Sequence, residues 1–192
     1  MIICKRLYFV IYVLYYGKYF RSYIFTVILS SLKSPSLAES FNLVRNHSTR
    51  AAKDVLSLPN WVIFNYLIGN SDAHGKNLSL LLLEKGPVLA TVYDLLSTRV
   101  YAHYGLAAKM AMKIGGENNP QAVQKKHWQQ FAEDVGIKPH LVLTRVAALA
   151  RKIEVVRLQL FQDAFAPYRC DALYRLMGLV SEQTETTLKR IL

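Results

Sequence analysis

The sequence predicts a mainly helical domain that carries one short β-hairpin, and three patterns lead to this fold class. Apolar residues recur every three or four positions in segments 61–68 and 142–160, which is the spacing of a helix face packed on a core. Two short apolar runs, 78–83 and 88–93, flank the turn-forming residues 84–87, and this arrangement is typical of a hairpin.

The first helix is expected to begin at Ser48 or Thr49, because either hydroxyl can cap a helix N-terminus. Proline lacks the N–H that a helix interior needs, so Pro59 is expected to interrupt or restart this helix. Gly69 follows the last residue of the apolar stripe and is expected to end the helix.

Three more helices are expected beyond Pro120. Gly136 closes one of them, and Pro139, a residue that fits the first helical turn, opens the next. A last helix is expected from about Asp171 to the end of the chain. The packing stripe predicted for the helix that starts at Pro139 consists of Val142, Val146, Leu149, Ile153, Val156 and Leu160.

Residues 1–31 differ in composition from the rest of the chain, since they hold six of the twelve tyrosines and a long apolar run. A membrane-spanning helix needs about 20 uninterrupted apolar residues, and Lys18 and Arg21 break this stretch, so membrane insertion is not favoured. We therefore expect an atypical hydrophobic, Tyr-rich segment over 1–31, one domain over 32–192 and a cytoplasmic location. Membrane association through residues 7–29 is the alternative.

The formal net charge is +11, and the lysines and arginines are scattered along the chain. Such a surface suits solvent, an acidic protein partner, tRNA or nucleotide phosphates about equally well, so charge alone names no ligand. The two cysteines, Cys4 and Cys170, lack metal-site spacing and indicate neither a zinc site nor a disulfide framework, which fits a reducing compartment.

A polar loop, residues 69–77, lies between the first predicted helix and the hairpin. Protein kinases place a catalytic aspartate five positions before an asparagine, and Asp72 and Asn77 have this spacing. Asp94 follows seventeen positions later, at the expected end of a strand, where kinases carry the carboxylate that bridges magnesium and phosphate. Oxygen ligands suit magnesium, and an aspartate that positions the substrate hydroxyl suffices as the base for phosphoryl transfer.

Structural interpretations of the same loop remain open. Aspartate and asparagine commonly serve as turn formers or helix caps, so the pair Asp72 and Asn77 is a weak signal when taken alone. His74 could lie near the phosphates or cap the loop by hydrogen bonding. Lys76 could meet a phosphate or be solvated.

Longer stretches of the sequence carry the motifs Phe64-Asn65, Leu67-Ile68-Gly69-Asn70, Asp72-Ala73-His74, Lys76-Asn77, Tyr93-Asp94-Leu95-Leu96-Ser97 and Lys109-Met110-Ala111-Met112-Lys113-Ile114-Gly115-Gly116. Together these motifs resemble the C-terminal lobe of the HipA family of toxin kinases, and the resemblance covers about residues 41–160. The loop is also similar, more distantly, to that of the aminoglycoside phosphotransferases. The resemblance implies a kinase-like C-terminal helical lobe over 32–192, with its β-hairpin at the nucleotide cleft. The catalytic loop and metal site would lie within 61–117, and a helical bundle would follow over 120–192.

The resemblance also implies roles for individual residues. Asp72 would be the catalytic base, and Asn77 and Asp94 would be the ligands of Mg²⁺. The residues that would bind ATP are His74, Gly75, Lys76, Asn77, Tyr93 and Asp94.

By the same resemblance, the implied activity is ATP- and Mg²⁺-dependent phosphorylation of a protein serine or threonine in a type II toxin–antitoxin system. The implied partners are a HipB-like DNA-binding antitoxin, with DNA contacted only through that antitoxin, and an aminoacyl-tRNA synthetase as the protein substrate.

The chain departs from the family pattern near its beginning, because residues 1–47 resemble neither the phosphate-binding loop nor the strand lysine of the family's N-terminal lobe. Thr91 and Pro59 depart from the pattern as well. An active kinase would then need a separate N-lobe chain to complete the phosphate contacts. One alternative is a non-catalytic module that docks an antitoxin or a target protein, and another is a decayed fragment with an exposed former lobe interface.

Overall fold

The computed structural model describes residues 8–13, 25–30, 35–105 and 109–192. The chain divides into two compact units, of which the first comprises Met1–Leu58 and His74–Asp94 and the second comprises Pro59–Ala73 and Leu95–Leu192. Helix α2 (Ala51–Ile68) contributes residues to both units.

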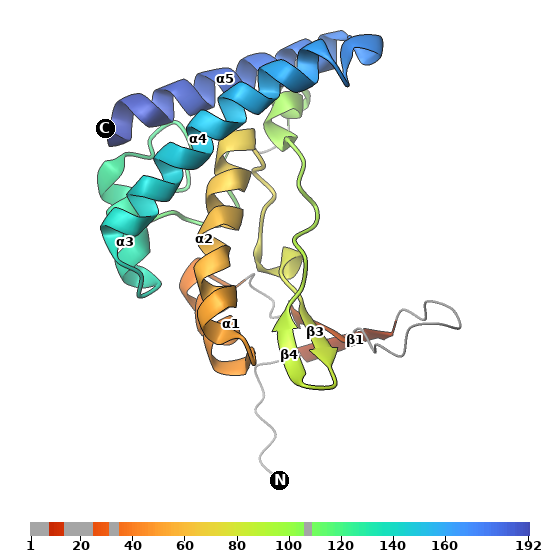
Figure 1. The fold of residues 1–192 in the computed structure, drawn as a ribbon, viewed down its shortest axis with the longest axis vertical. Coiled ribbons are helices and arrows are strands. Elements are labelled where there is room, and N and C mark those ends of the chain that lie inside the picture. The colour runs from red at the N-terminus through yellow and green to blue at the C-terminus, as the bar shows by residue number, and fades with distance from the viewer. Residues whose placement is uncertain (1–7, 14–24, 31–34, 106–108) are drawn as a thin grey trace. The chain divides into compact units, whose positions relative to one another are not determined.

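Helices make up most of the described structure, and the predicted mainly helical fold with a short hairpin is confirmed (Figure 1). The other helices are α1 (Leu37–His47), α3 (Lys125–Asp134), α4 (Pro139–Gln162) and α5 (Asp171–Ile191). The strands β1 (Tyr8–Val13) and β2 (Phe25–Ser30) form one antiparallel pair, and β3 (Leu80–Leu83) and β4 (Gly86–Leu89) form another. Short 3-10 turns occur at η1 (Gly75–Asn77), η2 (Thr98–Tyr104) and η3 (Ala166–Tyr168).

The atypical segment predicted over residues 1–31 is described only at β1 and β2. The remainder of that prediction lies outside the described residues. Within the part of the chain that the structure describes, no helix has both the length and the apolar character to span a membrane.

A capping box fixes the start of α1 in the first unit. The Ser36 hydroxyl accepts the Glu39 backbone N–H at 3.2 Å, and the Glu39 carboxylate accepts the Ser36 backbone N–H at 2.7 Å. The bond from the Ser36 backbone is the main reason that the pKa of Glu39 lies below its usual value. Phe41 and Val44 are buried on this helix, which contacts β4.

The hairpin of β3 and β4 is the one predicted from the sequence. Its register leaves Glu84 and Lys85 as a two-residue turn. The paired residues are Leu80 with Leu89, Leu81 with Val88, Leu82 with Pro87 and Leu83 with Gly86.

The second strand of the hairpin is shorter than predicted. It ends at Leu89 and not at residue 93, so the expectation that Asp94 ends a strand is wrong. The Tyr93 hydroxyl turns back to donate to the Lys76 carbonyl at 2.8 Å, and Asp94 has a φ of 57°, which is incompatible with an extended strand. The irregular segment after β4 therefore carries the second predicted carboxylate.

The N-terminal end of α2 holds β4 in the first unit. The Thr49 backbone N–H and hydroxyl both donate to the Pro87 carbonyl, at 2.8 and 2.9 Å. The buried Asp54 carboxylate accepts the Leu89 N–H at 2.8 Å and the Ser48 hydroxyl at 2.6 Å. A buried carboxylate is stable only with such partners, so this contact anchors the chain where β4 ends.

Replacing Gly86 by alanine is expected to destabilise the protein by about 1–3 kcal/mol, measured by urea denaturation. Gly86 has a φ of +105°, and an added Cβ would lie 2.4 Å from the Thr49 Cγ2 methyl. The double variant Gly86→Ala/Thr49→Ser removes that methyl but keeps the hydroxyl that binds Pro87. It should therefore recover part of the loss, and a double variant as unstable as the single one would contradict the clash.

The expectation that Pro59 interrupts or restarts a helix is wrong, because α2 runs unbroken from Ala51 to Ile68 with Pro59 inside it. Proline in a helix interior removes one hydrogen bond and costs about 3 kcal/mol. Leu58 and Ile63, on either side of the proline, are fully buried, and burial of one such side chain contributes about 1.5–3 kcal/mol. The apolar burial along α2 thus outweighs the lost hydrogen bond.

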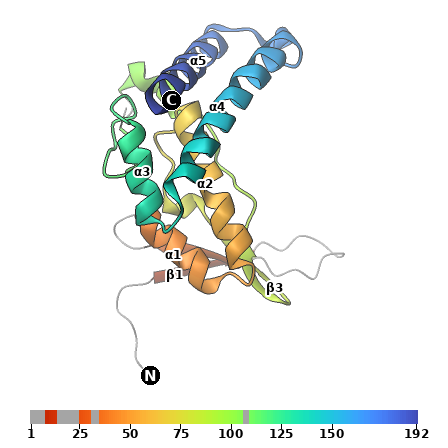
Figure 2. The same cartoon turned by 60° about the vertical axis from the view of Figure 1, so that its left-hand side comes forward.

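The second unit is built on α3, α4 and α5, of which α4 and α5 lie side by side in both views (Figures 1 and 2). Trp128 of α3 is the largest fully buried side chain of this unit. The Tyr66 ring contacts the Trp128 ring in an edge-to-face arrangement, with 5.2 Å between the ring centroids. Burial raises the pKa of Tyr66, whose hydroxyl donates to the Pro120 carbonyl at 3.2 Å. The predicted boundaries at Gly136 and Pro139 are confirmed.

The stripe predicted along α4 is fully buried only near the start of the helix. Val142 and Val146 are fully buried, whereas Val156 and Leu160 are 37% and 41% exposed. The amphipathic period continues along the sequence, but the buried core of the unit ends before the helix does. The prediction that the whole stripe packs inward is therefore wrong for its last turns.

A polar cluster joins that part of α4 to α5. Glu154 accepts hydrogen bonds from Thr184 at 3.0 Å and Ser181 at 3.2 Å, and it pairs with Arg157. The hydrogen bond from Arg157 is the main cause that lowers the pKa of Glu154 below 4.5. Because the folded pKa is depressed, the stability that this carboxylate adds is present above pH 4.5 and is lost as the pH falls through the lowered pKa.

Candidate functional site

The predicted site residues are distributed over the two units. Asp72 belongs to the second unit, and the first unit holds His74, Gly75, Lys76, Asn77, Tyr93 and Asp94. Each group is held by hydrogen bonds within its own unit.

A chain of buried amides supports the loop that carries Asp72. The Asn65 side chain donates to the Trp61 carbonyl at 2.9 Å, and the Asn70 side chain donates to Asn65 Oδ1 at 2.7 Å. Asn70 Oδ1 in turn accepts the Asp72 backbone N–H at 3.2 Å. Asn65 and Asn70 are 3% and 4% exposed, whereas Asp72 is exposed. Helix α2 thus fixes the backbone of Asp72 and leaves its side chain in solvent.

Two later segments also hold this loop within the second unit. The Ser71 N–H donates to Thr98 Oγ1 at 2.7 Å, and the Arg99 N–H donates to the Gly69 carbonyl at 3.1 Å. The Ala111 N–H donates to the Ser71 carbonyl at 2.8 Å. Gly69 and Ser71, on the two sides of Asn70, are therefore hydrogen-bonded to residues that are distant in the sequence.

Replacing Asn70 by leucine is expected to cost about 1–3 kcal/mol of stability, because it leaves Asn65 Oδ1 buried without its donor. Urea denaturation of Asn70→Leu, Asn65→Leu and the double variant measures the coupling between the two amides. The double variant removes both partners together, so its cost should fall clearly below the sum of the single costs. Additive costs would contradict the amide chain.

Asn77 and Asp94 are in contact in the first unit, with the amide nitrogen of Asn77 facing the carboxylate and its oxygen facing His74. Asn77 Nδ2 donates to Asp94 Oδ2 at 2.5 Å, and Asn77 Oδ1 accepts the His74 backbone N–H at 2.8 Å. The His74 donor requires the amide oxygen on its side, which fixes the orientation of the amide. Asn77 is 5% exposed, and Asp94 is exposed. The pair therefore offers an exposed carboxylate that rests on a buried amide.

Asp94 has an unusual backbone conformation. Among the described residues it is the only one other than glycine with a positive φ, at 57°. Aspartate tolerates this left-handed region better than most residues but still at some cost, and such strain concentrates at functional sites. The hydrogen bond from Asn77 is one contact that holds the strained residue in place.

The other predicted nucleotide-binding residues surround this pair. The Tyr93 hydroxyl bonds the Lys76 carbonyl at 2.8 Å and the Ser79 hydroxyl at 2.9 Å, and Tyr93 as a whole residue is 42% exposed. Lys76 is exposed. The buried Nδ1 of His74 has no hydrogen-bond partner within the described residues.

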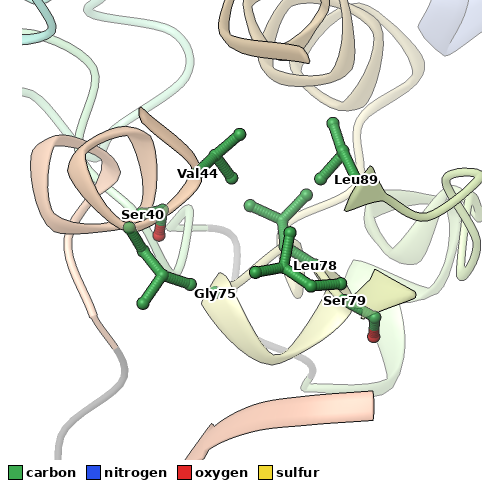
Figure 3. Close-up of a pocket in the computed structure, with 8 residues that line it drawn as sticks. Ser40, Val44, Gly75, Leu78, Ser79 and Leu89 are labelled. Atoms are coloured by element: carbon green, nitrogen blue, oxygen red, sulfur yellow. The ribbon is translucent and has the colours of Figure 1, made fainter. Parts of the chain in front are cut away.

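Gly75 marks a close approach of two chain segments within the first unit. An added Cβ at this position would lie 2.3 Å from Pro35 Cγ, so only glycine fits. A shallow pocket beside it is lined mainly by apolar side chains of α1, β3 and β4 (Figure 3). Ser40 and Ser79 are its only hydroxyl-bearing lining residues. None of the residues that line this pocket is charged.

Sequence reasoning missed the residues that position the site. Asn65 and Asn70 form the amide chain, Thr98 binds the loop backbone, and Asp54 anchors the end of β4. Asn65 was visible as a polar residue within the apolar stripe of the helix, and a polar side chain there needs a partner. The sequence contains no comparable signal for Asp54 or Thr98.

The fold and the loop define a class of protein, namely a mainly helical lobe with a carboxylate–amide pair next to a two-stranded hairpin. The profile of the HipA-like C-terminal domain matches residues 22–156. The chain belongs to this family, and the resemblance predicted from the motifs is confirmed.

Two curated relatives match part of the chain. A candidate kinase of Sinorhizobium fredii, Y4mE, is 44% identical over 115 residues, which are 60% of this chain and 27% of that protein. The serine/threonine-protein kinase toxin HipA of Shewanella oneidensis is 32% identical over 103 residues, which are 54% of this chain and 23% of that protein. The chain matches only about a quarter of the length of these relatives.

A solved structure shares the fold. It is the complex of HipA, HipB and operator DNA from Shewanella oneidensis, in which the matching chain has a TM-score of 0.72 and 22% identity. The match covers 82% of this chain and 37% of that one. The predicted fold, a HipA-like C-terminal lobe, is confirmed.

Proposed function

We propose that the chain is the C-terminal lobe of a HipA-like serine/threonine kinase of a toxin–antitoxin system, which transfers the γ-phosphate of ATP to a protein hydroxyl. The observation that carries the proposal is the contact between the Asn77 amide and the Asp94 carboxylate. The interpretation of this contact as part of a kinase site comes from the family, since one curated relative is named as a serine/threonine-protein kinase toxin.

Asn77 and Asp94 are the proposed ligands of Mg²⁺. Magnesium in nucleotide sites takes one or two protein oxygens and completes its shell with water and phosphate oxygens. Asn77 Oδ1 accepts the His74 N–H and has a second lone pair, and the exposed Asp94 carboxylate adds a charged oxygen, so the donors fit this ion. Bound there, the ion would neutralise charge on the transferred phosphoryl group.

The remaining ligands would have to come from the nucleotide. Among the described residues no group of three or more His, Cys, Asp or Glu side chains is placed to hold a metal ion by itself. We therefore propose that the cation binds well only together with ATP. His74, whose buried Nδ1 has no hydrogen-bond partner within the described residues, is also proposed to line the nucleotide. Gly75, Lys76 and the exposed residue Tyr93 complete the proposed nucleotide contacts.

Asp72 is the proposed base that accepts the proton of the substrate hydroxyl. Phosphoryl transfer passes through a loose transition state, so an ionised carboxylate that positions the hydroxyl suffices. The amide chain supports this role, since it fixes the backbone of Asp72 while the side chain faces solvent.

The proposed partners follow from the same family. The solved relative contains HipB and operator DNA, which favours a HipB-like DNA-binding antitoxin as partner, with DNA bound only through it. An aminoacyl-tRNA synthetase is the proposed protein substrate by family analogy. We propose a cytoplasmic location for this system.

A second candidate function is a non-catalytic module that docks an antitoxin or a target protein. Exposed apolar side chains near the end of α4, in η3 and near the start of α5 favour it, with Val155, Leu158, Tyr168 and Tyr174 between 47% and 72% exposed. Such a surface would bind a partner without any chemistry at Asp72.

Phosphate transfer distinguishes the two candidates. The purified chain is incubated with γ-labelled ATP and Mg²⁺, alone and with the proteins encoded next to it. Labelled protein serine or threonine supports the kinase. Stable co-purification with a helix-turn-helix antitoxin, without transfer under any pairing, would instead support the docking module and contradict the kinase.

A further inference from the structure

We propose that Arg99 and Gln183 are positioning residues, which hold the loop of Asp72 in place for the reaction by connecting it to helix α5. This inference rests on the proposed function and adds to it two residues that lie outside the predicted site. It depends on three observations within the second unit, namely the hydrogen bonds at the start of η2, the approach of α5 to Gly69 and the burial of the Arg99 charge.

The start of η2 is hydrogen-bonded to the loop of Asp72. Thr98 Oγ1 accepts the Ser71 N–H at 2.7 Å. The Arg99 N–H donates to the Gly69 carbonyl at 3.1 Å. Because Ser71 directly precedes Asp72, a displacement of η2 would move the backbone that carries the proposed base.

The side chain of Arg99 connects η2 to α5. Its Nη1 donates to Gln183 Oε1 at 2.8 Å, and Gln183 is 7% exposed. Gln183 lies in the interior of a 21-residue helix, so the helix hydrogen bonds fix its backbone. The guanidinium therefore joins the start of η2 to a regular element of the second unit.

Helix α5 also approaches the loop directly at Gly69. This residue has a φ of +75°, and an added Cβ would lie 2.8 Å from Leu179 Cδ2 and 3.3 Å from Arg99 Cβ. Leu179 precedes Gln183 by about one helical turn, so both residues lie on the same face of α5. This face therefore contacts the first residue of the loop and, through Arg99, the start of η2.

Stability alone does not explain why an arginine occupies this position. Burial is the main cause that lowers the pKa of Arg99 below its usual value, so the folded state disfavours the charged form. The charge of Glu182 opposes this effect without cancelling it. The acceptor Gln183 is a neutral amide, so the hydrogen bond adds no attraction between opposite charges. A charged residue that is kept at a cost in stability is typical of a functional position.

The connection is expected to act on the rate of phosphate transfer and not on nucleotide binding. The proposed nucleotide contacts, residues 74–77 and 93–94, belong to the first unit. Loosening the loop of Asp72 would displace the base, and a displacement of about 1 Å can lower a rate about 100-fold. kcat should therefore fall while KM for ATP stays unchanged.

Three variants of the full chain test this expectation with labelled ATP and the partner that supports transfer. Gln183→Leu removes the acceptor, and we expect it to lower kcat at least about tenfold. Gln183→Glu restores an acceptor for the Arg99 guanidinium and should recover most of the parent rate. The matched control is Arg190→Met, which removes another hydrogen bond from an arginine of this unit, the one from Arg190 Nη1 to the Val123 carbonyl at 3.2 Å. It should transfer phosphate at the parent rate.

Amide hydrogen exchange of the ¹⁵N-labelled chain tests the connection without ATP or metal. We expect the Ser71 and Arg99 N–H groups to exchange at least about tenfold faster in Gln183→Leu than in the parent chain. The N–H of Ile137, which donates to the Ala132 carbonyl at 2.8 Å, should exchange at the parent rate. Arg190→Met should leave the exchange of Ser71 and Arg99 unchanged.

An equal acceleration at Ile137 would show general destabilisation and overturn the proposal. An equal loss of transfer in Arg190→Met, or a full kcat in Gln183→Leu, would overturn it as well. A parent chain that transfers no phosphate with any partner would remove the kinase assignment, and the exchange of Ser71 and Arg99 would then decide by itself whether α5 holds the loop.

Discussion

Phosphate transfer to a protein substrate is expected to fall by about 10²–10⁴-fold when Asp72 is replaced by asparagine. Asparagine has nearly the same shape but cannot accept the hydroxyl proton. The change should lower kcat and leave the affinity for ATP unchanged, because Asp72 is proposed to act on the hydroxyl and not on the nucleotide. The measurement is the steady-state rate with labelled ATP in the presence of the partner that supports transfer.

The control for this prediction is Asp163→Asn, at an exposed aspartate after the end of α4. It should transfer phosphate at the unchanged rate. Because Asp72 is exposed, its replacement should also leave the unfolding midpoint in urea unchanged. A full transfer rate in Asp72→Asn would remove Asp72 from the reaction.

Replacing Asp94 by asparagine is expected to weaken Mn²⁺ binding in the presence of nucleotide by more than about 100-fold. The variant removes the charged oxygen that Asn77 contacts and leaves two amides, which are poor ligands for a hard cation. Asparagine adopts the left-handed backbone of this residue as readily as aspartate, so the fold should be kept. Free Mn²⁺ is measured by electron paramagnetic resonance.

Asp171→Asn, at an exposed aspartate in the first turn of α5, serves as the control and should bind Mn²⁺ like the parent chain. Equal losses in both variants would indicate a general effect of charge. Undiminished binding in Asp94→Asn would place the cation elsewhere.

Local patterns predicted those elements whose signals are local. The hairpin follows from turn residues between two apolar runs, and the start of α4 follows from Pro139, whose fixed φ and missing N–H suit a first turn. The kinase spacing predicted that Asn77 and Asp94 lie near each other, and they are in contact, although the expectation that Asp94 ends a strand is wrong.

The failures have a common physical cause, which is that burial and long-range contacts decide where local rules apply. Pro59 was expected to interrupt a helix, yet α2 continues through it because apolar side chains on both sides of the proline are buried. Val156 and Leu160 keep the helical period but lie beyond the core. Apolar character alone predicts neither outcome.

The end of β4 was predicted too late, because an apolar run in the sequence does not show that its residues pair with a neighbouring strand. The Ala90 N–H still donates to the Ser79 carbonyl, but the paired strand ends at Leu89, and Tyr93 turns its hydroxyl to the Lys76 carbonyl. The amide chain from Asn65 to Asp72 was missed because it depends on which side chains face one another after folding. Sequence reasoning therefore identified the proposed reacting residues but not the residues that hold them in place.

Localising the cation tests the central claim most directly. In the spectrum of the ¹⁵N-labelled chain with nucleotide, low concentrations of Mn²⁺ should broaden the amide signals of Asn77, Tyr93 and Asp94 first. Asp94→Asn should abolish the selective broadening. Broadening that begins at other acidic residues and spares Asn77 and Asp94 would contradict the account.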